Sequence, residues 1–206
     1  DFRAHGNSEK VPKEQSVEIM TEDIFQLMKF LKINKASFVG FSMGGAVAFQ
    51  TALLHPENVD KLVILNSGPD FNNAKDSGVD ILGERTKIIK EQGFSTLAQT
   101  ISAGMFPEDN QKEWRDEFEQ RIVSNDEDAY LKTFGELMNW GMGKKISEIP
   151  HQTLVIASDM DYTPVEYKKS YTDKMQHAKL VVIENSRHGV VLDQAEKLNE
   201  ELLKFL

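Results

Sequence analysis

Residues 36–57 read ASFVGFSMGGAVAFQTALLHPE, and this stretch decides how the rest of the chain is interpreted. It begins with SFVGF, a short run of aromatic and β-branched residues that is typical of a strand. The segment that follows, up to Leu54, is apolar nearly all round, which predicts a buried helix ending before Pro56. Ser42 therefore lies in a turn between a strand and a helix.

Gly40, Ser42 and Gly44 match the pattern G-x-S-x-G, which places a serine on a sharp turn between a strand and a helix. Such a turn strains the serine backbone, so the neighbouring side chains must be nearly absent. The helix N-terminus also directs free N–H groups and the positive end of its dipole at any developing anion. We predict that Ser42 is a nucleophile; the alternative is a glycine-rich loop that joins a strand to a helix.

A serine hydroxyl is a poor nucleophile until a base, commonly a histidine oriented by a carboxylate, takes its proton. His188 directly follows a buried apolar run in VVIENSRHGVV. A loop at the carboxyl end of a parallel strand is where functional residues collect in α/β folds, so we predict that His188 is the base. The other histidines lie at a helix end, in turns or ahead of the serine, and we expect structural or surface roles for them: His5, His55, His151 and His177.

Candidate carboxylates lie in the stretch TLVIASDMDYTP, which ends a predicted strand and contains Asp159 and Asp161. Either one would lie beside the loop that carries His188, and Asp70 is a more distant third candidate. The group Asp159, Asp161, Glu184 and His188 matches no metal-ligand spacing, so we predict no metal site. We predict no cofactor either.

Three further apolar runs predict buried parallel strands at 61–67, 153–158 and 179–185. Helical patterns at 17–33, about 164–176 and 191–206 alternate with them, which predicts a parallel α/β sheet with helices on its faces. Residues 71–149 contain no convincing strand. Apolar spacing there predicts four helices, marked by Ile81, Ile88 and Ile89, by Leu97, Ile101 and Met105, by Trp114, Phe118 and Ile122, and by Tyr130, Phe134 and Met138.

The predicted organisation is an α/β core at 1–70 and 150–206 with a helical cap at 71–149, where a plain helical excursion is the alternative to a cap.

The chain has 206 residues, with 24 Lys and Arg against 33 Asp and Glu, and a net charge of −9. This acidic balance argues against nucleic acid or an anionic membrane as a partner. Because there is no cysteine and no apolar run near about 20 residues, we expect a cytoplasmic protein without disulfides.

Four segments resemble the α/β-hydrolase superfamily, in its serine-nucleophile branch: DFRAHGNSEK, VGFSMGG, VIASDMDYTPVE and VIENSRHGVVLDQAEKLNEELLKFL. Within that branch the chain is similar to 3-oxoadipate enol-lactonase and to cofactor-free haloperoxidase-like esterases. The resemblance implies the order Ser42, Asp161, His188, since counting from Ser158 in the acid loop leads to Asp161. It also implies that the backbone N–H of Met43 forms part of the oxyanion hole.

The chain also departs from the family pattern. Ala4 and Ser158 stand where glycines are usual. Family members begin with several strands and a loop that donates the second oxyanion N–H, and the resemblance leads us to expect that this chain lacks roughly that first quarter of the fold. We therefore expect SFVGF to be an open apolar sheet edge. Either a longer native protein or another chain, such as a second copy, would cover that edge.

The expected function is hydrolysis of a carboxylic ester or lactone through an acyl-enzyme. Phe41, Phe106, Trp140 and Met142 are candidate pocket walls for a small, largely apolar substrate, with ordinary cap packing as the alternative. Perhydrolysis or C–C bond hydrolysis would use the same triad. A rival class is a non-catalytic protein that binds small molecules on the same fold, or an inactive fragment.

Overall fold

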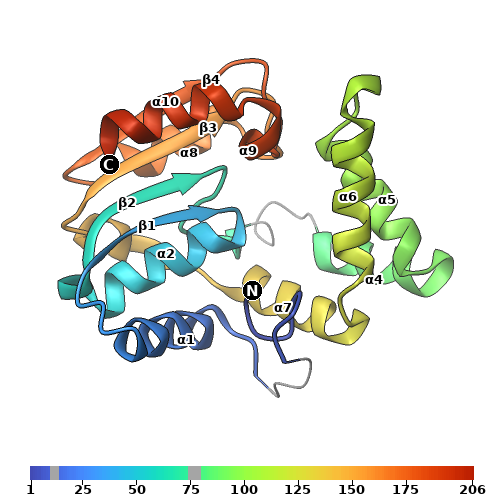
Figure 1. The fold of residues 1–206 in the computed structure, drawn as a ribbon, viewed down its shortest axis with the longest axis horizontal. Coiled ribbons are helices and arrows are strands. Elements are labelled where there is room, and N and C mark those ends of the chain that lie inside the picture. Colours follow the sequence, from blue (N-terminus) through green and yellow to red (C-terminus); the bar gives the residue numbers. More distant parts are fainter. Residues whose placement is uncertain (10–13, 74–79) are drawn as a thin grey trace. The chain divides into compact units, whose positions relative to one another are not determined.

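The computed structural model describes residues 1–9, 14–73 and 80–206, and the chain forms two compact units (Figure 1). One unit contains the sheet and comprises Val17–Asp70 and Gly141–Leu206. The other comprises Asp1–Ser16 and Phe71–Trp140. Residues 10–13 of the predicted core and 74–79 of the predicted cap lie outside the described residues. The division into core and cap at 71 and 149 stays a prediction.

All four predicted strands are present, with bounds that differ from the prediction by one or two residues: β1 (Ala36–Phe41), β2 (Val59–Leu65), β3 (Gln152–Ser158) and β4 (Ala178–Ile183). They form one parallel sheet in the order β1-β2-β3-β4. The register pairs Phe41 with Leu65, Leu65 with Ile156, and Ser158 with Ile183. The carboxyl ends of the four strands therefore meet at one edge of the sheet.

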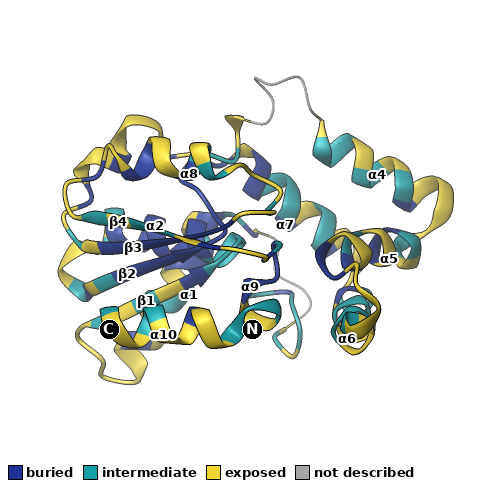
Figure 2. Ribbon diagram, turned by 90° about the horizontal axis from the view of Figure 1, so that it is seen from above, coloured by how far each residue is buried: buried dark blue, intermediate teal, exposed yellow. Residues whose placement is uncertain are grey.

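The helices of the sheet unit are α1 (Val17–Phe30), α2 (Met43–Leu54), α8 (Val165–Thr172), α9 (Val190–Asp193) and α10 (Ala195–Phe205), with short 3-10 turns at Pro56–Asn58 and Gly143–Glu148. One buried cluster joins strand residues such as Val63 and Ile156 to Val190 of α9 and Leu198 of α10. On α2, Phe49 makes an edge contact with Tyr171 of α8 at 6.0 Å between ring centroids. Figure 2 shows the buried strands in the middle of this unit. The central part of α2 is buried, as its all-round apolar sequence predicts.

Strand β1 lies at the end of the described sheet and pairs with β2. Its Val39 is 47% exposed, whereas Val63 of β2 is 0% exposed. The expectation that SFVGF forms an apolar sheet edge is confirmed for the residues that the structure describes. The chain segment or partner that would cover this edge stays a prediction.

The second unit contains the four helices predicted from apolar spacing: α4 (Ile81–Gln92), α5 (Phe94–Met105), α6 (Lys112–Val123) and α7 (Glu127–Asn139). Asp80 and Asp126 cap α4 and α7, because their side chains accept hydrogen bonds from backbone N–H groups of the first turn. The N-terminal segment joins this unit through Gly6, whose N–H donates to Oδ1 of Asn125 at 3.1 Å.

Candidate active site

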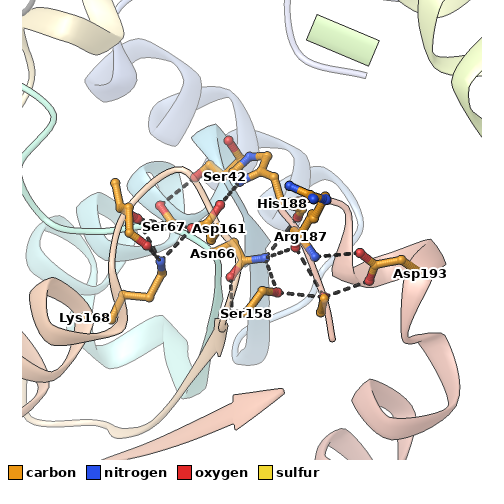
Figure 3. A network of polar contacts seen from close by, with 11 residues as sticks. Ser42, Asn66, Ser67, Ser158, Asp161, Lys168, Arg187, His188 and Asp193 are labelled. Carbon is orange, nitrogen blue, oxygen red and sulfur yellow. Dashed lines mark hydrogen bonds and ion pairs between the residues drawn. The ribbon is translucent and has the colours of Figure 1, made fainter. Parts of the chain in front are cut away.

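Four loops meet at the carboxyl edge of the sheet, and each carries a polar residue. Ser42 follows β1, Asn66 follows β2, Asp161 follows β3 and His188 follows β4. Figure 3 shows these labelled residues gathered in one network of polar contacts. The in-register parallel strands are the reason, since they bring the four loops to the same edge.

Ser42 is held in a strained backbone conformation, with φ 52 and ψ −118. Such a conformation costs about 1–3 kcal/mol and persists only where neighbours hold it. The N–H of Ser42 donates to the carbonyl of Leu65 at 3.0 Å, and its carbonyl accepts from Oγ of Ser67 at 2.7 Å. The main chain of the turn is therefore tied to β2, and the half-buried side chain stays accessible. Helix α2 begins at Met43, so the Met43 N–H is one of the first-turn groups without an intrahelical acceptor.

Two glycines near Ser42 are required by close packing. A Cβ at Gly40 would lie 2.3 Å from the carbonyl oxygen of Gly44, and a Cβ at Gly45 would lie 2.5 Å from Oγ of Ser67. A Cβ at Gly44 would meet nothing within 4 Å in the described chain. The predicted need for small neighbours thus holds at Gly40 and Gly45, while Gly44, the last residue of the G-x-S-x-G pattern, has open space.

His188 and Asp161 form a direct pair, with 2.6 Å between Nδ1 and Oδ1. The Asp161 side chain is 1% exposed and the His188 side chain 11%. The imidazole contacts two aromatic rings, Phe41 at 5.0 Å between ring centroids and Tyr162 at 4.5 Å. Phe41 directly precedes Ser42, so its contact with His188 places the imidazole on the same side of the site as the serine (Figure 3). With Nδ1 engaged, Nε2 is the ring nitrogen that can exchange a proton with a hydroxyl.

The second oxygen of Asp161 is also bonded. Oδ2 accepts from Nζ of Lys168 at 2.6 Å and from Oγ1 of Thr163 at 3.1 Å. Burial raises the pKa of Asp161, but the hydrogen bond from His188 and the positive charges of His188 and Lys168 outweigh it, so the net pKa is lowered. Asp161 is therefore a carboxylate at neutral pH.

Of the three candidate carboxylates, Asp161 is the one bonded to His188. Asp159 instead accepts backbone N–H bonds from Asn185 and Ser186, both at 3.0 Å, and so braces the histidine loop. Asp70 accepts the N–H of Gly143 at 2.6 Å. The geometry thus favours the acid that the sequence count from Ser158 indicated.

The other four histidines make local contacts, in line with the structural or surface roles expected for them. His55 stacks on Phe25 at 3.7 Å between ring centroids. The remaining contacts are His5 Nδ1 to the Arg3 carbonyl at 2.9 Å, His151 Nε2 to the Pro56 carbonyl at 2.8 Å, and the His177 carbonyl to the Thr153 N–H at 2.9 Å.

The predicted pocket residues divide between the two units. Phe41 contacts His188, and Met142 is buried in the sheet unit. Phe106 and Trp140 belong to the helical unit, where both are buried and pack within it: Phe106 against Trp114 and Phe118, and Trp140 against Phe71. Phe41 is tied to the site by its contact with His188, and a pocket role for Phe106, Trp140 and Met142 stays a prediction.

Asn66 is a site residue that the sequence reasoning missed. Its Nδ2 donates to Oγ of Ser158 at 2.8 Å, to the carbonyl of Arg187 at 3.2 Å and to the carbonyl of His188 at 3.0 Å. Its Oδ1 accepts the N–H of Ser158 at 2.8 Å. The sequence feature that could have revealed Asn66 is a polar residue directly after the buried apolar run in KLVILNS.

Lys168 was missed as well. A lysine three positions from Val165 and three from Tyr171 falls on the inward side of α8, where an apolar residue is the usual choice. A charged residue at such a position was the signal that a buried partner exists.

Two kinds of feature are not found within residues 1–9, 14–73 and 80–206. No helix there is long and apolar enough to cross a membrane. No group of three or more His, Cys, Asp or Glu residues there could hold a metal ion.

Comparison with known proteins gives a family match over nearly the whole chain. Residues 1–195 match the family model described as the alpha/beta hydrolase fold. The solved structure described as Est816, an N-acyl homoserine lactone degrading enzyme, superposes with a TM-score of 0.86 at 25% identity, covering 100% of this chain and 81% of that one.

Two curated relatives are hydrolases by name. The chain is 26% identical over 220 residues to "Putative carbamate hydrolase RutD" of Caulobacter segnis, covering 100% of this chain and 79% of the relative. It is 29% identical over 209 residues to the 2-hydroxy-6-oxononadienedioate/2-hydroxy-6-oxononatrienedioate hydrolase of Comamonas testosteroni, covering 95% of this chain and 71% of the relative.

Proposed function

The chain belongs to the alpha/beta hydrolase fold family, and on this premise we propose that it is a serine hydrolase that cleaves a carboxylic ester or a lactone. Hydrolase activity is the coarse function that the family and the named relatives support. The ester or lactone substrate, the serine mechanism and the residue roles are the finer proposal.

One observation carries this proposal: the 2.6 Å pair between Nδ1 of His188 and Oδ1 of Asp161, located at the sheet edge where Ser42 is held with φ 52. A histidine whose Nδ1 is bound by a buried carboxylate has its tautomer and ring orientation fixed. A serine on a strained turn beside that ring is suited to covalent catalysis.

In the proposed mechanism Ser42 Oγ attacks the carbonyl carbon while Nε2 of His188 takes the hydroxyl proton. The resulting imidazolium then protonates the leaving alcohol, and the C–O bond breaks to give an acyl-serine. His188 next deprotonates a water molecule, which hydrolyses the acyl-serine and returns the proton to Ser42. Asp161 remains ionised throughout and stabilises the imidazolium.

The oxyanion that forms on the carbonyl oxygen needs hydrogen-bond donors. The Met43 N–H is suited to this because it opens α2, where the helix dipole also favours negative charge. Phe41, which contacts His188, would form an apolar wall beside the acyl group. These features fit a small, largely apolar acyl or cyclic substrate.

A second candidate is hydrolysis of a C–C bond with the same triad, and the 29% identical Comamonas testosteroni hydrolase favours it. Carbamate hydrolysis, suggested by the name of the Caulobacter segnis relative, would use the same carbonyl chemistry. Perhydrolysis stays open for the same reason. A panel of p-nitrophenyl esters, small lactones, carbamates and a 1,5-diketone, assayed at equal concentration, would rank these substrate classes.

The serine mechanism is tested by intact-mass spectrometry after treatment with a fluorophosphonate probe. We expect one adduct on the wild-type chain and none on Ser42→Ala. Ser170→Ala is the matched control, because it removes an exposed serine hydroxyl that bonds the carbonyl of Tyr167 on α8, and it should still be labelled. An unlabelled but folded wild-type chain would contradict the proposal and favour a binding protein on the same fold.

A further inference from the structure

Lys168 is a fully buried lysine that the proposed mechanism does not yet use. Its side chain is 0% exposed, and its Nζ donates to Oδ2 of Asp161 at 2.6 Å. The same Nζ donates to the carbonyl and to Oγ1 of Thr163, both at 2.7 Å. An ammonium has three donors, and here all three are used. Burying a charge is costly, and the complete pairing of the ammonium offsets part of that cost. The arrangement indicates that Lys168 has a specific role at this position.

The Asp161 carboxylate thus has a nitrogen partner on each of its two oxygens. Oδ1 faces the imidazole of His188 and Oδ2 faces Lys168, each at 2.6 Å. The lysine is on α8 and the histidine on the loop after β4, so two elements fix the plane of one carboxylate. A buried carboxylate bonded at one oxygen alone would be freer to rotate away from the imidazole.

The position of Lys168 affects the electrostatic stabilisation of His188 as well as the orientation of the Asp161 carboxylate. A carboxylate stabilises a neighbouring imidazolium, and a second cation on the same carboxylate weakens that stabilisation. We propose that Lys168 is a positioning residue that aligns the Asp161 carboxylate on His188 and lowers the proton affinity of that histidine. This inference rests on the proposed function, because it assigns a role within the same triad.

Two tyrosines of α8 near this pair are neutral at neutral pH, whereas Asp159, Arg187 and Asp193 in and around the histidine loop carry formal charges. Tyr171 on α8 donates its hydroxyl to the carbonyl of Ser67 at 2.9 Å, and burial raises its pKa. Tyr167 on α8 donates to the backbone carbonyl of Asp70, and burial, with a smaller effect of the Asp70 charge, raises its pKa to about 12. Burial lowers the pKa of Lys168 itself, and the bond to Asp161 opposes this. Lys168 is the cation bonded to the far side of the carboxylate from His188.

The test is the titration of His188, read in two ways on the full chain. Nuclear magnetic resonance of the imidazole gives its pKa without any need for activity. The pH dependence of the fluorophosphonate labelling rate gives its acid limb, which is the pH range in which the serine loses reactivity as the pH is lowered. Lys168→Met and Lys168→Gln remove the charge, Lys168→Arg keeps it, and Lys169→Met removes the neighbouring lysine, which is 62% exposed and paired with Asp173.

In Lys168→Met and Lys168→Gln we expect the resonance titration and the acid limb of labelling to move together to higher pH, because a nearby positive charge is lost. Lys168→Arg and Lys169→Met should both titrate as the wild type does. A lysine that served only to fill the interior would lower the labelling rate in the Met and Gln variants without moving either titration.

The inference is overturned if His188 titrates alike in the wild type, Lys168→Gln and Lys169→Met. If Lys168→Met does not fold, the comparison of the Gln and Arg variants decides, since both retain a hydrogen-bond donor. Failure of the proposed function is a separate outcome: a wild-type chain that the probe does not label contradicts the serine mechanism, while the resonance titration still tests Lys168.

Discussion

The side-chain amide of Asn66 donates a hydrogen bond to the main-chain carbonyl of His188 at 3.0 Å. This bond ties the end of β2 to the loop after β4 across the intervening strand β3. Asn66 also has a positive φ of 45 and holds Ser158 through both atoms of its amide. The histidine is thus held at both ends: its ring by Asp161 and its main chain by Asn66.

Replacing Asn66 by Ala should destabilise the fold by about 2 kcal/mol, because a buried N–H and buried carbonyls lose their partner. Asn66→Gly loses the same bonds but tolerates the positive φ, so it should be more stable than the Ala variant by about 1 kcal/mol. Urea unfolding monitored by circular dichroism measures both differences. Asn199→Ala is the matched control, since Asn199 is exposed on α10, and its stability should change by under about 0.5 kcal/mol. Equal stability of all three variants would contradict the role of Asn66.

The two glycines of the G-x-S-x-G pattern should respond differently to alanine. Gly40→Ala places a Cβ 2.3 Å from a backbone oxygen that cannot move alone, so we expect a loss of about 3 kcal/mol or more. Gly44→Ala meets open space in the first turn of α2, where alanine is the better helix former, so stability should stay equal or rise. Thermal melts of the two variants decide, and a Gly44→Ala variant as unstable as Gly40→Ala would show that the space at Gly44 is filled.

Replacing Asp161 should slow ester hydrolysis much more than replacing Asp159. Asp161→Asn keeps the shape of the site but favours the wrong histidine tautomer, so ester hydrolysis should fall by about 1,000- to 10,000-fold in kcat. Asp159→Asn weakens two backbone bonds of the histidine loop and should cost about tenfold or less. Steady-state kinetics on the best ester of the panel compares them. The assignment of Asp161 fails if Asp159→Asn is the more damaging change.

Stability should depend on the ionisation of Asp161 in acid. Its pKa in the folded chain is lowered, so its contribution is fully present above the unfolded-state pKa of about 4 and is lost as pH falls through the folded value. Unfolding free energies from pH 7 down to pH 3 should therefore fall less steeply in Asp161→Asn than in the wild type. Asp116→Asn serves as the control, because that carboxylate side chain is 55% exposed and its charge is screened by water. An unchanged slope in Asp161→Asn would contradict the ionised, paired state of Asp161.

The elements of the fold were predictable where apolar patterning is strong. The four strands and α2 agree with the sequence prediction to within a few residues, and each of the four helices at 81–139 contains the apolar residues that predicted it. The C-terminal pattern at 191–206 was read as one helix, but the structure has α9 and α10 separated at Gln194. Apolar spacing continues across that break, since Val190 and Leu198 pack into the same cluster, and periodicity therefore could not reveal it.

The candidate site was predictable where one residue type has few chemical alternatives. Ser42 and His188 stood out because the turn motif and the loop after a buried strand each point to a particular chemistry. Asp159 and Asp161 could not be separated by position alone, since both follow β3. Their roles depend on which backbone N–H groups or side chains face each carboxylate, and only the folded loops provide those partners.

The sequence by itself determined the parallel α/β class and the sharp turn at Ser42, because these depend on local spacing and on turn chemistry. The order of serine, acid and histidine came from the family resemblance and stays a prediction. The tertiary structure alone decided that Lys168 is bonded to Asp161 and that Asn66 holds His188. These contacts join residues on different elements, and the sheet register that brings them together is a property of strand pairing rather than of any single segment.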